Sequence, residues 1–389
     1  MRTVGVIAEY NPFHPGHARQ LALARQQAEA DCVAVVMSSC FTQRGGAAVL
    51  SPSVRARMAL MHGADIVFAL PCCWAARDAE RFALGGVRLL QLLGAEAISF
   101  GAETAEPALL TKAAGLLESG EVAAALQQAM SSGLSYPAAL QKAVGAVSPD
   151  AAALLASPNN TLALCYLRAM RHLHADMEVF PIARTGDYHA TALADIPSAT
   201  ALRAAIDRGD WQGLQRALPE DVFALLRREA MAGRMMRPGA LDQALLYRLR
   251  TMTIDNWHAL PELSEGIEDR LRKAATTSST REALLAAAKT RRYPYARLSR
   301  LCAHALLGIT QAQLDAEPLP DALWLLGLTD KALPLLRRLK QRGVPVISKV
   351  ADASPDAAWF RTEMLAYDLW TLGCGQPAGL AMRQGVVRI

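Results

Sequence analysis

The N-terminal residues constrain the fold more than any other segment of the chain. Residues Val4–Ala8 form a continuous apolar run, which predicts a strand buried on both faces. Residues Glu9–Pro15 predict a turn, and Gly16 then opens a helix with apolar residues at helical spacing. A strand, a turn and a helix in this order are typical of an α/β fold with a parallel sheet.

The turn has the chemistry of a phosphate-binding site. A helix N-terminus presents unpaired backbone N–H groups and a partial positive charge to the loop before it. His14 and His17 lie three positions apart, so both imidazoles are on one side of the first helical turn and can donate to the same phosphate chain. Gly16 allows close approach to the backbone, and Pro12 and Pro15 stiffen the loop. The alternative is a surface turn whose histidines only cap the helix, but its place after the first strand favours a nucleoside-triphosphate site.

Apolar, β-branched runs separated by helical stretches predict that the sheet continues along the chain. The predicted strands and helices are Cys32–Met37, Arg55–His62, Ile66–Leu70, Arg77–Leu93 and Ala97–Phe100, in alternation. Such strands form parallel sheets, whose ligands bind beyond the carboxyl ends of the strands. The polar and glycine residues that follow predicted strands, and are therefore expected at this edge, are His14, His17, Gln43, Arg44 and Gly101.

Three domains are predicted along the 389 residues. Residues 1–205 form a Rossmann-like nucleotide domain. Residues 206–316 consist almost entirely of amphipathic helices and form a second, helical domain. Residues 317–389 contain two predicted strands, Trp324–Leu328 and Pro345–Val350, around a basic helix, and form a small α/β module.

Composition excludes several classes of protein. Hydrophobic residues make up 52% of the chain, and the formal net charge of +5 permits nucleic-acid binding without requiring it. The seven cysteines show no C-x-x-C spacing, which predicts reduced core thiols and neither a disulfide framework nor a metal site. The longest uncharged apolar stretch, Ile66–Ala76, is too short to span a bilayer, and no signal peptide is visible. We therefore expect a cytoplasmic protein without a membrane partner.

Short motifs along nearly the whole chain resemble those of a known family. H-x-G-H at His14–His17 is similar to the signature of adenylyl-transferring enzymes, which include class I aminoacyl-tRNA synthetases. A narrower set of motifs, in their order and spacing, resembles the bacterial tRNA(Met) cytidine acetate ligase family. These motifs are E-Y-N-P-F-H-P-G-H (9–17), F-T-Q-R-G (41–45), F-G-A-E (100–103), P-N-N (158–160), D-Y-H (187–189), S-A-T-A-L-R (198–203) and K-T-R-R-Y-P-Y-A-R-L-S-R (289–300).

The resemblance implies a nucleotidyltransferase fold and a two-step ligase reaction. Acetate would be activated with ATP, accompanied by Mg²⁺, as acetyl-adenylate, and the acetyl group would then pass to the wobble cytidine of elongator tRNA(Met). Acetate and this tRNA are the expected partners, and no obligate protein partner is inferred. No dedicated carboxylate cage for magnesium is visible in the sequence.

The resemblance also implies which residues act on ATP. Those expected in catalysis are His14, His17, Arg44, Ser198, Thr200 and Arg203. Those expected to bind ATP are Ile7, Ala8, Glu9, Tyr10, Asn11, Pro12, Phe13, Gly16, Gln20, Gly101, Asn159, Asn160 and Arg184, with the choice between the two asparagines left open. On the residues alone, Arg44 also suits a solvated loop, Ser198 a helix N-cap, and Pro158–Asn160 an ordinary helix start. His189, in D-Y-H, is more typical of a structural histidine.

A basic cluster in the helical domain is the predicted tRNA-binding surface. Its cations can neutralise phosphates, and Tyr293 and Tyr295 among them can stack on unpaired bases. The alternative is a solvated helix face with its tyrosines packed inward. A second basic run, within 337–342, is a weaker candidate. The cations of the first cluster are Lys289, Arg291, Arg292, Arg297 and Arg300.

Two other functions use part of the same pattern. A small-molecule nucleotidyltransferase would share the H-x-G-H chemistry, but such enzymes usually consist of one compact domain without a basic helical half. An RNA-binding protein that uses a nucleotide without catalysis is the other alternative. Nucleotide binding without pyrophosphate release would favour the latter.

Overall fold

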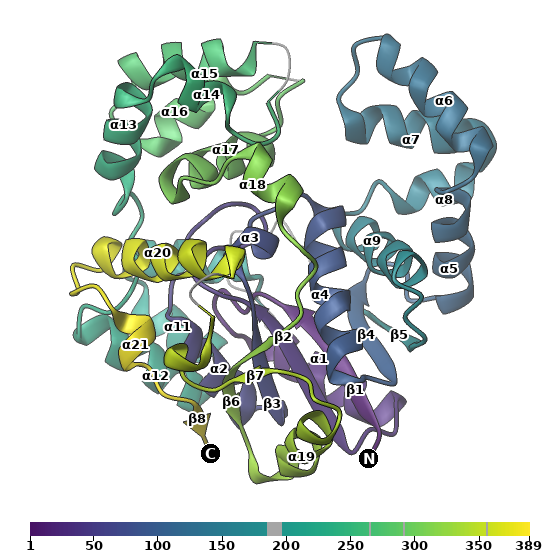
Figure 1. The fold of residues 1–389 in the computed structure, drawn as a ribbon, viewed down its shortest axis with the longest axis vertical. Coiled ribbons are helices and arrows are strands. Elements are labelled where there is room, and N and C mark those ends of the chain that lie inside the picture. Colours follow the sequence, from purple (N-terminus) through teal and green to yellow (C-terminus); the bar gives the residue numbers. More distant parts are fainter. Residues whose placement is uncertain (185–196, 264–265, 291, 355–356) are drawn as a thin grey trace.

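The fold is α/β, with one large sheet surrounded by helices (Figure 1). The computed structural model describes residues 1–184, 197–263, 266–290, 292–354 and 357–389. Within these residues the sheet has eight strands, in the order β5-β4-β1-β2-β3-β6-β7, with β8 paired to β6. The strands are β1 (Thr3–Ala8), β2 (Cys32–Ser38), β3 (Ile66–Leu70), β4 (Ala97–Ala102), β5 (Glu178–Ala183), β6 (Leu323–Leu328), β7 (Val346–Ile347) and β8 (Val387–Arg388).

The strands of the N-terminal half are parallel, as their alternation with helices predicted. β1 lies between β4 and β2, so the turn after β1 is at the carboxyl edge of the sheet and has neighbouring strands on both sides. Every residue of β2 and β3 is buried, which explains their continuous apolar composition. Gly5 of β1 permits close packing, since a Cβ there would lie 2.5 Å from the Leu90 side chain. The helices of this half are α1 (Pro15–Gln27), α2 (Pro52–Met61), α3 (Cys72–Ala75), α4 (Ala79–Leu93) and α9 (Pro158–His172).

The C-terminal segment extends this sheet. β6 pairs antiparallel with β3, with Ile66 opposite Leu328, and β7 and β8 both pair with β6. All of β6 is buried, so its six apolar residues are covered on both faces. Residues 317–389 therefore have the predicted mixture of strands and helices, but their strands continue the N-terminal sheet and do not form a separate one. The helices of this segment are α19 (Leu333–Gln341), α20 (Ala358–Gly373) and α21 (Leu380–Arg383), with short 3₁₀ turns at Asp330–Ala332 and Val350–Asp352.

The predominantly helical region between these two halves contributes to two hydrophobic cores. Its first helices pack with the core of the sheet through residues that include Leu202, Leu214 and Leu226. A second core is formed by residues between Leu245 and Ala305. How the chain divides into independently folding domains stays a prediction. The helices are α10 (Ala199–Arg208), α11 (Trp211–Ala217), α12 (Glu220–Met231), α13 (Asp242–Thr251), α14 (Ile254–His258), α15 (Ile267–Thr277), α16 (Arg281–Ala288), α17 (Tyr295–Leu307) and α18 (Gln311–Ala316).

Two helical groups stand at the end of the molecule opposite the two chain termini (Figure 1). Helices α13–α17 lie on one side, and the hairpin of α6 and α7 lies on the other. The helices that lead into and out of this hairpin are α5 (Pro107–Leu116), α6 (Gly120–Ser131), α7 (Tyr136–Val147) and α8 (Pro149–Leu154).

Two expectations drawn from composition concern the state of the cysteines and the presence of membrane-spanning helices. All seven cysteines are free thiols, and six of them are buried, as predicted for core thiols. Among the described helices, none is both long and apolar enough to cross a membrane.

Candidate active site

The turn after β1 is organised by its two histidines. His14 is the N-cap of α1, and its Nδ1 accepts a hydrogen bond from Gly16 N at 3.1 Å. Nδ1 of His17 accepts in turn from His14 N at 3.3 Å, which completes a capping box. The two rings stack with their centroids 3.6 Å apart. The helix consequently begins at Pro15, one residue before the predicted start.

Both imidazoles are neutral at physiological pH. Burial lowers the pKa of His14 to about 3, and the charges of Arg184 and Arg203 act in the same direction. Burial, the neighbouring His14 and Arg184 lower the pKa of His17 well below its usual value. Because each Nδ1 accepts a backbone N–H, each neutral ring carries its proton on Nε2. No described residue hydrogen-bonds either Nε2 atom, so the rings cap the helix with one nitrogen and keep a donor for a ligand with the other.

Two arginines from distant segments meet the same turn. Arg203 lies on α10, and its Nη1 donates to Asn11 O at 2.7 Å and its Nη2 to Thr200 Oγ1 at 3.1 Å. Arg184 follows β5 and is close enough to the histidines to lower the pKa of both. Ser198 caps α10, with its Oγ accepting from Ala201 N at 3.0 Å. The N-cap interpretation of Ser198 is therefore correct, and the same helix end brings Thr200 and Arg203 to the turn.

The two asparagines of P-N-N differ in what their side chains contact. Asn160 is buried, and its side chain both accepts from Thr104 N at 3.0 Å and donates to Thr104 Oγ1 at 3.3 Å. Asn159 is half-buried, donates to Glu103 Oε1 at 2.6 Å and accepts from Arg184 Nη1 at 3.3 Å. Gly101 lies beside Arg184, whose Cγ would be 3.3 Å from a Cβ at the glycine. Asn159, Arg184 and Gly101 thus form one contiguous patch, while Asn160 holds the β4–α5 loop.

The other residues expected at ATP divide into buried and partly accessible ones. Tyr10 is buried, with its ring packed edge-on against His17 at 4.8 Å and Phe13 at 5.0 Å between centroids. Asn11 is also buried, and its Oδ1 accepts from Val49 N at 2.8 Å. The buried members of the set, which support the turn from within, are Ile7, Tyr10, Asn11, Pro12 and Phe13. The half-buried members are Ala8, Glu9, Gly16 and Gln20.

A loop after β2, which we call the QRG loop (residues 41–51), connects the turn to the helical region. Gln43 N donates to Glu9 Oε1 at 2.7 Å, so the loop is tied to the end of β1. Gly45 has φ +75° and packs against the backbone of α17, where a Cβ would lie 2.7 Å from Arg300 Cα. Arg44 has an exposed side chain, and its carbonyl accepts a hydrogen bond from Ser299 Oγ. The loop therefore presents Arg44 beside the carboxyl edge of the sheet.

The family of the chain follows from comparison with known proteins. The family model described as HIGH Nucleotidyl Transferase matches residues 1–378. The chain belongs to this family. It is 34% identical to the tRNA(Met) cytidine acetate ligase of Syntrophomonas wolfei subsp. wolfei, over 87% of this chain and 85% of that protein. It is also 34% identical to the enzyme of the same name from Lactiplantibacillus plantarum, over 90% of this chain and 89% of the relative.

Solved structures show the same fold. The apo crystal structure of TmcAL from Thermotoga maritima superposes with a TM-score of 0.93 at 25% identity, with both chains fully covered. A second structure, of the same protein bound with alpha-thio ATP, gives a TM-score of 0.91. The family predicted from the motifs and the predicted α/β fold are both confirmed.

The members of the basic cluster expected to bind tRNA differ in burial and in the groups that they contact. Two guanidinium nitrogens of Arg300, Nε and Nη2, donate to the Glu262 carboxylate, at 2.8 and 2.6 Å, and Arg300 is buried. Arg297 donates to Glu262 O. Although burial acts in the opposite direction, the hydrogen bond from Arg300 lowers the pKa of Glu262. Arg297 and Arg300 thus hold a segment of the helical region together.

The remaining members of that cluster lie closer to solvent. Lys289 and Arg292 are exposed, whereas Arg291 lies outside the described residues, as does His189. Tyr293 is buried, as the structural alternative proposed, but Tyr295 is exposed and donates its hydroxyl to Glu282 Oε2 at 2.9 Å.

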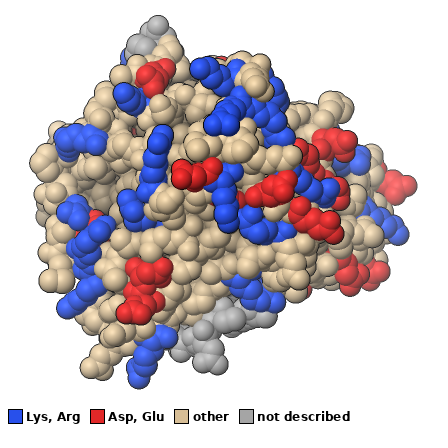
Figure 2. All heavy atoms as spheres, turned by 90° about the horizontal axis from the view of Figure 1, so that it is seen from below, with Lys and Arg blue, Asp and Glu red and all other residues tan. Residues whose placement is uncertain are grey.

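The second basic run lies on and just after α19, at the end of the molecule where the two chain termini lie (Figure 1). Arg338 of α19 donates to Glu96 Oε1 at 3.0 Å and to Gly94 O at 3.2 Å, so it fastens α19 to the loop before β4. Viewed from this end, basic side chains are interspersed with acidic ones (Figure 2). This face therefore lacks the single-sign field that attracts a polyanion.

Three residues important to the site escaped the sequence analysis. Glu103 accepts from Asn160 N at 2.8 Å and so closes the start of α9. Arg55 and Glu363 are fully buried charged residues; Arg55 donates to Leu50 O of the QRG loop, and Glu363 accepts from Cys72 N at the start of α3. The F-G-A-E motif contains Glu103 and so was an indication of it. Nothing in the sequence near Arg55 or near Glu363 indicates which residues they contact.

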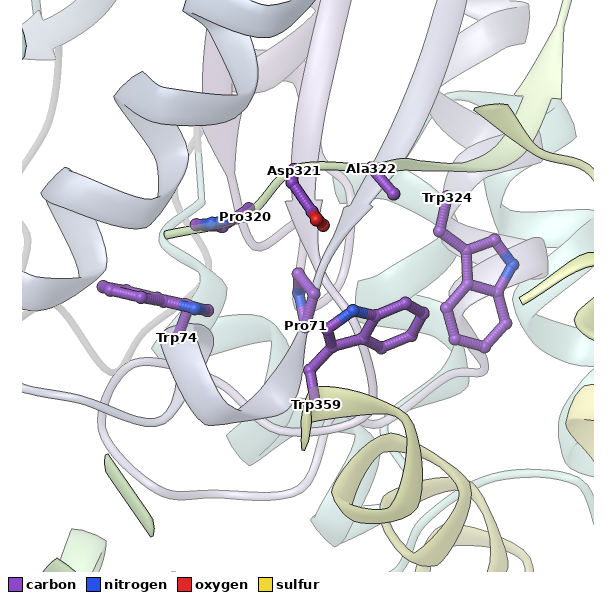
Figure 3. Close-up of a pocket in the computed structure, with 7 residues that line it drawn as sticks. All are labelled: Pro71, Trp74, Pro320, Asp321, Ala322, Trp324 and Trp359. Carbon is purple, nitrogen blue, oxygen red and sulfur yellow. The ribbon is translucent and has the colours of Figure 1, made fainter. Parts of the chain in front are cut away.

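Two other features carry no further site. A recess at the end of β3 is lined by three tryptophans, Trp74, Trp324 and Trp359 (Figure 3), but its volume of about 10 Å³ is only enough for one water molecule. Among the described residues, no three His, Cys, Asp or Glu side chains are grouped so as to hold a metal ion.

Proposed function

We propose that this protein uses ATP to activate acetate as acetyl-adenylate and acetylates the wobble cytidine of elongator tRNA(Met), giving N4-acetylcytidine. The observation that carries the proposal is the convergence on one turn of two neutral imidazoles, two arginines and two helix N-termini. Each of these groups favours negative charge, and together they suit a triphosphate. The names of the relatives supply the acceptor and the acyl donor.

In the first step, a carboxylate oxygen of acetate attacks the α-phosphorus of ATP. A new bond between this oxygen and Pα forms as the bond from Pα to the oxygen that bridges to Pβ breaks, and pyrophosphate leaves with that electron pair. No proton transfer is needed. The Nε2–H groups of His14 and His17 donate to the phosphates, and Arg203, Arg184 and Arg44 neutralise the charge that develops on them. Neutral imidazoles donate without competing for a proton, which fits a step that requires none.

In the second step, the N4 amine of cytidine attacks the acetyl carbon and AMP leaves. The amine loses one proton as the amide forms. We assign no general base to this step, since the phosphate of the departing AMP and solvent are both acceptors for that proton.

The ATP contacts follow from which side chains retain accessible donors. Asn159 is the proposed nucleotide contact of the pair, because its side chain is half-buried and borders Arg184, whereas the Asn160 side chain is buried and bonded to Thr104. Gly101 allows the nucleotide to approach β4 closely. Magnesium would accompany ATP, held mainly by phosphate oxygens and water.

The tRNA surface is proposed around the exposed cations Lys289 and Arg292. Arg291, between two such residues in sequence, belongs to this proposal on sequence grounds only. Arg297 and Arg300 contribute indirectly, by holding α17 against Glu262.

The test is tRNA-dependent AMP formation from ATP with labelled acetate, first with total bacterial tRNA and then with tRNA(Met). Label in cytidine of tRNA(Met) is the expected result. ATP binding without pyrophosphate release would instead support a non-catalytic RNA-binding protein. Pyrophosphate release that requires a phosphate-bearing small molecule in place of acetate would support a small-molecule nucleotidyltransferase.

A further inference from the structure

A buried arginine connects the histidine turn to the QRG loop. Arg55 of α2 has no exposed surface. Its Nε donates to Leu50 O at 3.0 Å, its Nη1 donates to Glu9 O at 2.6 Å and to Ser38 O at 3.0 Å, and its Nη2 donates to Ser39 O. These carbonyls belong to three segments: the end of β1, the end of β2 and the end of the QRG loop. One side chain therefore sets the spacing of all three.

This function requires a guanidinium. Burial lowers the pKa of Arg55 to about 10, so the group remains charged at neutral pH. Its N–H donors point in fixed directions within one plane, whereas a lysine presents three donors from a single atom. A lysine at this position would leave carbonyls of the site unpaired in the interior.

Helix α20, near the C-terminus, contacts the same loop through Trp370. Trp370 is buried, and its Nε1 donates to Ala48 O at 2.7 Å, in the middle of the QRG loop. Glu363, two turns earlier on the helix, has no exposed surface, and its Oε2 accepts from Cys72 N at 2.6 Å, where α3 begins. Burial raises the pKa of Glu363 to about 7, although its neighbours Ser39 and Cys72 act in the opposite direction.

We propose that Arg55, Glu363 and Trp370 are positioning residues for the adenylation step. Arg55 and Trp370 hold the QRG loop at the required distance from the histidine turn, and Glu363 fixes α20, which carries Trp370, to the start of α3. None of their described hydrogen bonds is directed at the histidines or at Arg44, so they act through backbone groups. The inference rests on the proposed function, because it takes Arg44 to act on ATP. It adds that helix α20, far away in the sequence, is part of the support of the catalytic site.

The sharpest test is Trp370→Phe in the full-length protein, because it removes one N–H donor and keeps most of the buried ring. We expect kcat for acetate-dependent ATP–pyrophosphate exchange to fall about tenfold, while KM for ATP and the number of ATP-binding sites per chain stay the same. Arg55→Lys should lower kcat further, by about 100-fold. If the rate per ATP-binding site is unchanged in both variants, the proposal is wrong and these residues only stabilise the fold.

Two further substitutions separate positioning from general packing. Trp359→Phe is the matched control, because Trp359 lies on the same helix but lines the small recess beside Pro71 and Trp324 (Figure 3). It should leave kcat unchanged, and an equal loss there would overturn the inference. Glu363→Ala should behave like Trp370→Phe, whereas Glu363→Gln keeps an acceptor for Cys72 N–H and should restore most of the rate.

A second readout does not depend on the proposed reaction. Hydrogen–deuterium exchange of the backbone amides in residues 41–51 should become faster in Trp370→Phe and stay unchanged in Trp359→Phe. If the unmodified protein shows no acetate-dependent exchange of pyrophosphate, the proposed function fails, and this measurement still decides whether the residues position the loop. Unchanged amide exchange in Trp370→Phe would contradict the inference in either case.

Discussion

The histidine turn and the start of α17 were both predicted to bind a ligand, ATP and tRNA respectively, because basic or titratable side chains are grouped there. In the structure, the donors of these two groups have different kinds of partner. At the turn, His14 and His17 use Nδ1 for the helix cap, and no described residue hydrogen-bonds their Nε2–H groups. At α17, Arg300 directs both of its bonded nitrogens at the carboxylate of Glu262. A basic or titratable residue is therefore available to a ligand only if one of its donors is both accessible and not bonded to the protein.

The largest effect should come from His14→Ala. Loss of a pre-organised donor to a phosphate typically lowers the rate by about 10²–10³. We therefore expect acetate-dependent ATP–pyrophosphate exchange to fall by that factor, while the protein remains folded. His172→Ala, at an exposed position near the end of α9, is the control. Adenylate formation at the normal rate in His14→Ala would remove the histidine turn from the proposed mechanism.

The neutrality of His14 predicts a pH dependence of stability. Its pKa is about 3 in the folded protein and near 6.5 when unfolded, so below pH 6.5 the unfolded chain binds the extra proton. The folded state should lose roughly 1 kcal/mol per pH unit between pH 6 and 4 from this residue. His14→Asn keeps an N-cap and cannot titrate, so its unfolding free energy should fall less over this range. Equal slopes in denaturant titrations of the two proteins would show that His14 is not held neutral.

Because Arg300 is paired with Glu262, substituting it should lower the stability of the fold and should not remove a contact to a ligand. Arg300→Ala leaves the Glu262 carboxylate largely buried without its main partner, which should cost about 2–3 kcal/mol in the free energy of unfolding. Arg272→Ala is the matched comparison, because its pair with Asp269 is exposed, and it should cost less than about 0.5 kcal/mol. Similar unfolding free energies for the two variants would contradict a structural role for Arg300.

The smallest effect is expected at the exposed part of the basic cluster. Lys289→Ala combined with Arg292→Ala should leave stability and ATP binding unchanged and weaken tRNA binding several-fold. The slope of log affinity against log salt concentration should decrease by about one for each phosphate contact that is lost. An unchanged slope, measured by filter binding over a range of salt concentrations, would place the tRNA elsewhere on the protein.

Several parts of the molecule were predictable because their causes are local. The apolar runs of β1 to β4 predict buried strands, and H-x-G-H after the first of them predicts the start of a helix, which the structure shows capped by His14. Ser198 likewise carries its cap signal within its own helix. The different surroundings of Asn159 and Asn160 were not predictable, because they depend on Thr104, Glu103 and Arg184, which lie far from them in sequence.

The sequence by itself determined the nature of the N-terminal half, its family and the chemical groups of its turn, since strand burial, capping and motif spacing act over a few residues. Only the tertiary structure decided that β6 joins the N-terminal sheet, that Arg300 forms an ion pair with Glu262 and that Arg55 donates to carbonyls of three segments. The physical reason is that a buried charge or strand edge must find its hydrogen-bond partners in space. Those partners are brought together by the fold from positions that no local pattern relates.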